Sequence, residues 1–226
     1  MIGLVVVSHS RQLAAGVAEL AGQMAPRVAI VPSGGDGAGG LGTDYVAVGE
    51  AIAQADSGSG VVVLFDLGSA KMVADMAAEE AEGSVVVVDA PLVEGAVAAA
   101  VRAQGGAGLA EVAAAASSAG TVSSVSASAA SMASVADGEV VRADVELTNS
   151  VGLHARPAAL VVRALDSLDA SVAVRFGADS ADAKSVLALM GLGAPGGARV
   201  EVVASGVDAA EAVRRVEELA ARRFDE

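Results

Sequence analysis

The segment spanning residues 117–138 divides the chain into two parts that must fold separately. It holds eight serines and six alanines and shows no periodic stripe of apolar residues. Such a sequence cannot bury enough apolar surface to build a core, so we interpret it as a flexible linker. A frayed helix is the alternative, because alanine favours helix. We therefore expect one domain over residues 1–116 and another over 139–226.

Short apolar runs alternate with amphipathic stretches in the first part. The runs span residues 2–7, 28–31, 61–65 and 85–88. They are continuous and rich in valine, as is typical of strands buried on both faces of a parallel sheet. Between the first two runs, one helical face would carry Leu13, Val17, Leu20 and Met24. This alternation predicts an α/β domain with a parallel central sheet, in which functional residues lie at the carboxyl ends of strands.

The second part has a different period. Apolar and polar residues alternate over 141–147, 172–176 and 200–202, which indicates half-buried strands. Helices are indicated over 155–167 and 208–223, and we expect Asp208 and Glu211 to form a capping pair at the start of the last one. The pattern predicts an α+β domain, in which an antiparallel sheet carries helices on one face.

Composition excludes several classes of function. A formal net charge of −14 argues against broad nucleic-acid binding and against adhesion to anionic membranes. The absence of cysteine excludes disulfide scaffolds, thiolate metal sites and cysteine nucleophiles. The apolar runs are far shorter than the roughly 18 residues of a membrane helix, and the N-terminus does not resemble a secretory signal. We expect a cytoplasmic protein.

His9 and His154 are the only histidines, and they occupy similar places. His9 follows the first predicted strand, and His154 precedes Arg156 and Pro157 at a predicted helix start. Because helix N-termini stabilise anions, a neutral imidazole there could attack phosphorus and hold the phosphoryl group. Arg156 could add a bidentate clamp. The ordinary alternative for each histidine is a cap or a surface position, and no cluster with metal-ligand spacing supports a zinc site.

Two further side chains are candidates for the site around His9. Asp66 follows the run 61–65, so it should share the sheet edge with His9 and orient the imidazole ring. Its alternative role is to cap the next helix. Ser69 could be either a cap or a hydrogen-bond donor to a phosphoryl group. The glycine-rich loop 34–42 is not a P-loop, because no Gly-Lys-Ser/Thr sequence follows it.

The segments VGLHARPAALVV (151–162) and AKSVLALMGLGAPGG (183–197) resemble the HPr phosphocarriers of the phosphoenolpyruvate phosphotransferase system. The resemblance covers about residues 139–223 and implies an open-faced sandwich. It also implies that His154 is phosphorylated on Nδ1 and that Arg156 stabilises the phosphoryl group. Ser185 matches a serine that a kinase phosphorylates in some branches, although its ordinary role is a helix N-cap. Val151 stands where many members have asparagine.

Four stretches of the first part resemble the mannose-type enzyme IIA domain and, more closely, the DhaM family of phosphotransferase subunits of dihydroxyacetone kinase. They are LVVVSHSRQLAAGVAELAGQM, LGTDYVAVGEAI, DLGSA and APLVEG, spread across residues 1–103. The resemblance implies that His9 is phosphorylated on Nε2, that Asp66 orients it, and that this domain forms a homodimer. Since the sequence stops after the HPr-like region, we expect a separate enzyme I.

Together, the resemblances imply a relay from phospho-enzyme I to His154, then to His9, then to ADP. The ADP would be held by the nucleotide-binding kinase subunit, and a dihydroxyacetone-binding subunit would complete the reaction. The chain itself would need no cofactor and no metal. One alternative is a IIA–HPr fusion that serves a mannose-family sugar transporter. Another is a phosphorylation-dependent regulatory binding module. The sequence leaves open whether transfer is intramolecular, whether separate HPr can substitute, and whether Ser185 is modified.

Overall fold

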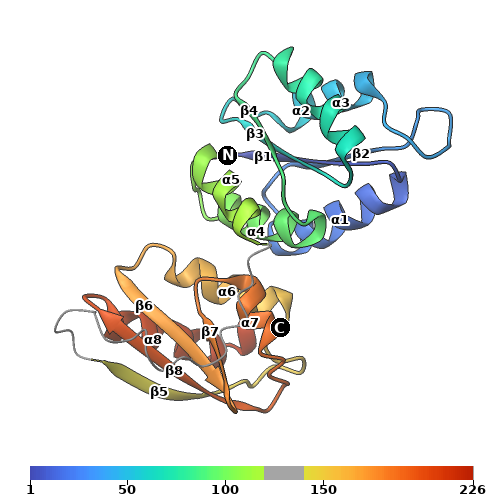
Figure 1. Cartoon of the computed structure of the whole chain (residues 1–226). Coiled ribbons are helices and arrows are strands. Elements are labelled where there is room, and N and C mark those ends of the chain that lie inside the picture. The colour runs from blue at the N-terminus through green and yellow to red at the C-terminus, as the bar shows by residue number, and fades with distance from the viewer. Residues whose placement is uncertain (120–139, 226) are drawn as a thin grey trace. The chain divides into compact units, whose positions relative to one another are not determined.

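The computed structural model describes residues 1–119 and 140–225, which form two compact units (Figure 1). Most of the predicted linker, residues 120–138, lies outside the described residues. Its first two residues, Ser117 and Ser118, instead end a helix. The first unit therefore extends slightly beyond the boundary that we predicted at residue 116.

The first unit is a parallel sheet between two layers of helices, which confirms the predicted α/β class. Its strands are ordered β2-β1-β3-β4, and every neighbouring pair is parallel. Figure 1 shows α2 and α3 on one face and α1, α4 and α5 on the other. The elements are β1 (Gly3–Ser8), α1 (Arg11–Met24), β2 (Ile30–Gly34), α2 (Tyr45–Ala55), β3 (Val61–Phe65), α3 (Gly68–Glu79), β4 (Val85–Val88), α4 (Leu92–Gln104) and α5 (Leu109–Ser118).

The two central strands supply both cores of this unit. All residues of β1 and β3 are buried. Because side chains alternate along a strand, Leu4 and Leu64 face α1, α4 and α5, whereas Val5 and Val63 face α2 and α3. The edge strands β2 and β4 are only partly buried. The expectation of four strands buried on both faces is therefore wrong for these two, since each has only one neighbouring strand.

The helical face predicted for α1 is also only partly correct. Val17 and Met24 are buried, but Leu13 and Leu20 are 43% and 42% exposed. Alanines take their place against the sheet, because small side chains let the helix approach closely. The full set of buried residues is Ala14, Val17, Ala18, Ala21 and Met24.

The second unit has an antiparallel sheet in the order β5-β8-β6-β7, which confirms the predicted α+β class. Its helices lie on one face of the sheet (Figure 1). Strand β7 and helix α7 are too short to give a periodic signal; β7 was not predicted, and α7 was indicated only by the possible role of Ser185 as a helix N-cap. The elements are β5 (Val141–Glu146), α6 (Ala155–Leu165), β6 (Ala170–Phe176), β7 (Asp179–Asp182), α7 (Val186–Gly191), β8 (Arg199–Gly206), α8 (Ala209–Ala221) and a 3-10 turn (Arg223–Asp225).

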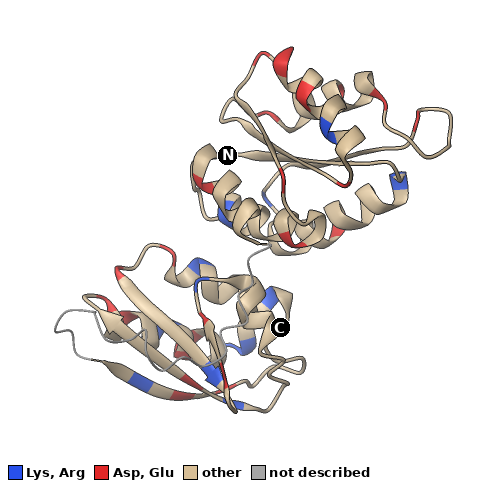
Figure 2. Ribbon diagram, in the orientation of Figure 1, with Lys and Arg blue, Asp and Glu red and all other residues tan. Residues whose placement is uncertain are grey.

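Charged pairs decorate the sheet of the second unit, whose strands show several charged segments in Figure 2. Glu201 on β8 pairs with Arg142 on β5 at 3.2 Å and with Arg175 on β6 at 3.3 Å. Exposed pairs of this kind contribute little individually, but they match charges across neighbouring strands. Among the described residues, no helix has the length and apolarity needed to cross a membrane.

The predicted capping pair of α8 is wrong. Asp208 occupies the N-cap position but makes no side-chain cap bond. Its carboxylate instead accepts a hydrogen bond from the backbone N–H of Asp169 at 2.8 Å. Glu211 pairs with Arg214 and Arg215 on the same helix. Other partners therefore compete successfully for both side chains.

The core placement of Leu64 can be tested by truncation. Leu64 is fully buried, so Leu64→Ala should lower the free energy of unfolding by about 2–5 kcal/mol through cavity formation. Chemical denaturation followed by circular dichroism measures the change. Leu41 is 80% exposed, and Leu41→Ala should change stability by less than about 0.5 kcal/mol. Equal losses in both variants would contradict the assignment of Leu64 to the core.

Candidate functional site

The register between β1 and β3 brings His9 and Asp66 together. Val7 and Phe65 are paired in this parallel register, so the residues that follow them leave the sheet at the same edge. The backbone N–H of Asp66 donates to the carbonyl of Val7 at 3.2 Å. Just after His9, Ser10 caps α1 by accepting from the N–H of Leu13. The site therefore begins where a central strand passes into a helix.

The imidazole of His9 is held at both nitrogens. Nδ1 lies 2.9 Å from Oδ1 of Asp66, and Nε2 lies 2.8 Å from Oγ of Ser69. Because an ionised carboxylate can only accept hydrogen bonds, Nδ1 carries the proton of the neutral ring. Nε2 then has the free lone pair and accepts the Ser69 hydroxyl. The His9 side chain is 26% exposed, and Nε2 is the ring nitrogen that carries the lone pair.

Asp66 accepts four hydrogen bonds. Oδ1 accepts from Nδ1 of His9 and from the N–H of Leu67, at 2.9 and 2.7 Å. Oδ2 accepts from Oγ of Ser8 and from the N–H of His9, at 2.8 and 2.9 Å. Burial raises the pKa of this carboxyl, but the bonds from His9 and Ser8 outweigh burial and hold the pKa below its ordinary value. Asp66 is therefore ionised at neutral pH.

The start of α3 lies next to Nε2 of His9. Its N-cap residue is Leu67, which makes no side-chain cap bond. The alternative role of Asp66 as the cap of this helix is therefore not what the geometry shows. The N–H groups of the first helical turn have no partner within the helix, and Ser69 lies in that turn. A negatively charged group on Nε2 would meet the Ser69 hydroxyl and the positive end of α3.

His154 lies at the N-cap position of α6, and its side chain is exposed. The ring makes no hydrogen bond within the described part of the chain. Arg156 lies in the first helical turn, is exposed, and likewise has no hydrogen-bond or ion-pair partner among residues 1–119 and 140–225. Pro157 is buried at the third helical position, where no N–H is needed. Both polar side chains are thus free to meet a ligand at the start of α6.

The loop before His154 is fixed by contacts that the sequence did not reveal. Asn149 is 2% exposed, and its Nδ2 donates to the carbonyl of Gly152 at 2.9 Å. The N–H of Leu153 donates to the carbonyl of Ala194 at 3.0 Å. Gly152 has φ +73, and a Cβ there would lie 2.1 Å from the Ala194 oxygen. Only glycine fits this position.

Ser185 has a local role of its own. It is the N-cap residue of α7, and its Oγ accepts from the N–H of Ala188 at 3.2 Å. This is the ordinary structural role that the sequence offered as the alternative.

Sequence reasoning did not identify Ser8, although a serine that ends an otherwise apolar strand is a recognisable signal.

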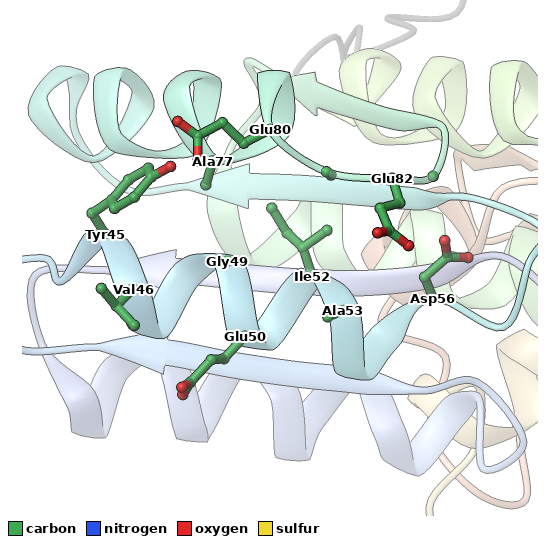
Figure 3. A pocket seen from close by; sticks show the side chains of 12 residues that line it. Tyr45, Val46, Gly49, Glu50, Ile52, Ala53, Asp56, Ala77, Glu80 and Glu82 are labelled. Atoms are coloured by element: carbon green, nitrogen blue, oxygen red, sulfur yellow. The ribbon is translucent and has the colours of Figure 1, made fainter.

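A groove runs along α2 and the end of α3 (Figure 3). Its lining combines apolar side chains, among them Ile52 and Ala77, with carboxylates such as those of Glu50 and Glu82. Tyr45 at one end is hydrogen-bonded to Glu80, which raises the pKa of the tyrosine. His9, Asp66 and Ser69 do not line this groove. The predicted site at the edge of the sheet is therefore not part of this groove.

Two family models match the chain. The model described as the PTS HPr component phosphorylation site matches residues 141–222. The model described as the PTS system fructose IIA component matches residues 3–113. The two matches correspond to the two units of the structure.

Curated relatives match the whole chain or a part of it. The phosphoryl donor subunit DhaM of the PEP-dependent dihydroxyacetone kinase of Providencia stuartii is 34% identical over 99% of this chain and 50% of its own length. DhaM of the PEP-dependent dihydroxyacetone kinase 1 of Listeria innocua is 38% identical over 45% of this chain and 82% of its own. The phosphocarrier protein HPr of Treponema pallidum is 34% identical over 36% and 93%. The chain spans about half the length of the relatives that match it throughout.

The loop before His154 can be tested with a pair of glycine substitutions. Gly177 also has a positive φ, +62, but a Cβ added there would meet no atom within 4 Å. Gly177→Ala should cost about 1–2 kcal/mol of stability from its left-handed backbone alone. Gly152→Ala should cost more and should shift the amide resonances of residues 149–156, because the backbone must move. Equal costs, with unchanged resonances, would contradict the close approach to Ala194.

The ionised state of Asp66 predicts a pH-dependent contribution to stability. Its folded pKa lies below the ordinary value of 3.8, so its contribution is fully present above that pH and is lost as the pH falls through the folded pKa. Asp66→Asn should therefore lower the melting temperature at pH 7, and the gap to wild type should narrow as the pH falls below 3.8. Calorimetry at a series of pH values measures the gap. A gap that stays constant down to the acid limit would argue against an ionised Asp66.

Proposed function

The chain belongs to the DhaM family, and from this premise we propose that it is a phosphoryl-relay subunit of a phosphoenolpyruvate-dependent dihydroxyacetone kinase. His154 accepts the phosphoryl group from enzyme I, His9 receives it from His154, and ADP on the nucleotide-binding kinase subunit receives it from His9. The observation that carries the proposal is the arrangement of His9, with Nδ1 held by Asp66 and the Nε2 lone pair directed at the Ser69 hydroxyl beside the start of α3.

The first step uses the exposed ring of His154. Nδ1 attacks the phosphorus atom, a P–N bond forms, and the bond between phosphorus and enzyme I breaks. The phosphoryl group then lies at the N-terminus of α6, where backbone N–H groups and the helix dipole favour negative charge. The guanidinium of Arg156 adds a charge-assisted clamp on the phosphoryl oxygens.

The second step transfers the group to His9. The Nε2 lone pair attacks phosphorus, the new P–Nε2 bond forms, and the P–N bond to His154 breaks. The proton on Nδ1 stays in its hydrogen bond to Asp66, whose negative charge offsets the positive charge that develops on the ring. Because both units belong to one chain, the reactants meet at the effective concentration of tethered partners.

Ser69 supports this step as a hydrogen-bond donor. Its Oγ lies 2.8 Å from Nε2 and donates to the lone pair that phosphorus must take, so the hydroxyl turns aside when the P–Nε2 bond forms. With Oγ this close to Nε2, it cannot lie on the far side of phosphorus from Nε2. In-line displacement requires the acceptor opposite the leaving nitrogen. Ser69 therefore donates to a phosphoryl oxygen and does not accept the group itself. The first turn of α3 adds its N–H groups on the same side.

The third step delivers the group to the kinase. The terminal oxygen of ADP, bound on the nucleotide-binding subunit, attacks phosphorus and the P–Nε2 bond breaks. A dihydroxyacetone-binding subunit then uses the nucleotide to form dihydroxyacetone phosphate. The proposal places no cofactor and no metal on this chain, which acts in the cytoplasm as a homodimer formed through its first unit. A IIA–HPr fusion for a mannose-family transporter would share the first two steps but not this one.

The order Ser69–His9–Asp66 also matches a serine hydrolase triad, and this observation favours a second candidate chemistry with Ser69 as the nucleophile. The two chemistries leave different marks on the chain. A phosphoryl relay modifies His9 with an acid-labile group. A hydrolase would carry an acid-stable adduct on Ser69 after reaction with an activated ester.

Labelling with enzyme I and labelled phosphoenolpyruvate tests the relay. Wild type should take up two acid-labile phosphoryl groups per chain, and His9→Ala should take up one. His154→Ala should take up none, because His9 has lost its donor, until separate HPr is added. Circular dichroism confirms that the variants are folded.

Addition of the kinase subunits and dihydroxyacetone completes the test. Wild type should form dihydroxyacetone phosphate, and His9→Ala should not. Formation of the product by His9→Ala would show that the order of transfer is wrong. Double labelling without product formation would favour the transporter or the regulatory module.

A further inference from the structure

Ser8 is a buried polar residue at the end of an apolar strand. It is 0% exposed and is the last residue of β1. Its Oγ donates to Oδ2 of Asp66 at 2.8 Å and accepts from the N–H of Ser10 at 3.0 Å. Burying a hydroxyl is costly unless its hydrogen bonds are made, and here both are made.

These two bonds give the Ser8 hydroxyl a fixed direction. The N–H of Ser10 can only donate, so it occupies a lone pair of Oγ, and the hydroxyl proton points to Asp66. The backbone of Ser8 is held as well, because its carbonyl accepts from the N–H of Gly35 at 3.3 Å. Ser8 is therefore a rigid donor, anchored in the sheet, that acts on only one oxygen of Asp66.

We propose that Ser8 is the positioning residue of the His9 site, which fixes the rotation of the Asp66 carboxylate so that Oδ1 stays on Nδ1. This role rests on the proposed function, because its purpose is to keep Nε2 as the nucleophilic atom. Without Ser8, Oδ2 retains only the N–H of His9, while Oδ1 keeps Nδ1 of His9 and the N–H of Leu67. The carboxylate is then held by three bonds in place of four and is less firmly fixed about its terminal bond. The Nδ1 proton is then less well held, and the ring samples the other tautomer.

Burial and hydrogen bonding together support this assignment. Alanine would fill nearly the same volume at position 8, so packing alone does not call for a hydroxyl. The hydrogen bond from Ser8 is one of those that lower the pKa of Asp66. Within the described residues, His9 is the titratable side chain that is hydrogen-bonded to Asp66. The protonation state of each group therefore affects that of the other.

A set of three variants of the full chain tests the proposal. Ser8→Ala removes the donor, and Ser8→Cys replaces it with a weaker one in a chain that has no other cysteine. Ser10→Ala is the matched control, since it deletes a hydroxyl two residues away that caps α1 and does not contact Asp66. NMR titration of the Asp66 carboxyl carbon and of the His9 ring nitrogens is made on the unphosphorylated protein. The rate of His9 labelling is measured separately.

In Ser8→Ala the Asp66 pKa should rise, the fraction of His9 with the proton on Nδ1 should fall, and His9 labelling should slow by about 10- to 100-fold. Ser8→Cys should give intermediate values. Ser10→Ala should lower the melting temperature but leave both titrations as in wild type. Unchanged titrations in a folded Ser8→Ala or Ser8→Cys protein would overturn the proposal, as would the same change in Ser10→Ala.

The titrations separate this proposal from the proposed function. They need no phosphoryl donor, so they test the positioning role even in a chain that is never phosphorylated. If wild type fails to label on His9 while the titrations respond as expected to Ser8→Ala, the relay is wrong and the positioning role stands. If labelling occurs but Ser8→Ala leaves the titrations of Asp66 and His9 unchanged, the positioning role is wrong and the relay stands.

Discussion

The hydrogen bond between Asp66 and Nδ1 of His9 joins the fold of the first unit to its proposed chemistry. It exists because β1 and β3 are neighbours in a parallel sheet and end at the same level. Their valine-rich sequences are buried on both faces of the sheet. A buried pair of strands thus presents a histidine and a carboxylate, and the carboxylate holds the proton on Nδ1 so that the lone pair lies on Nε2.

The second unit also places a histidine at a helix start, but it does so without a carboxylate partner among the described residues. His154 has no carboxylate partner among the described residues and stands exposed at the start of α6, where Arg156 is free to act. The position of His154 is fixed by the preceding loop, which Asn149 and Gly152 hold in one conformation. An exposed donor histidine can approach several partners, whereas His9 offers one defined nitrogen. This difference suits a relay in which the phosphoryl group moves from an exposed carrier to a dedicated donor site.

Periodicity in the sequence predicted the fold class of both units and the limits of β3 and β4, because long runs of valine leave few alternatives. It also placed Asp66 at the edge occupied by His9. The prediction failed where a side chain contacts residues that are distant in sequence. Asp208 accepts a hydrogen bond from Asp169 instead of capping α8, and alanines, not Leu13, pack α1 against the sheet. Asn149 was missed for the same reason, since its role depends on three-dimensional contacts that local patterns do not encode. Ser8 is recognisable as a serine at the end of an apolar run, but its partner Asp66 lies 58 residues away in the sequence.

The position of the phosphoryl group on each ring tests the central claim most directly. Combined ³¹P and ¹⁵N NMR of the fully phosphorylated chain distinguishes a phosphoryl group on Nδ1 from one on Nε2. The account predicts phosphorus bonded to Nε2 of His9, with the Nδ1 proton still in its hydrogen bond to Asp66, and phosphorus on Nδ1 of His154. Phosphorus on Nδ1 of His9, or on Oγ of Ser69, would contradict it, because Asp66 would then not determine the reactive atom.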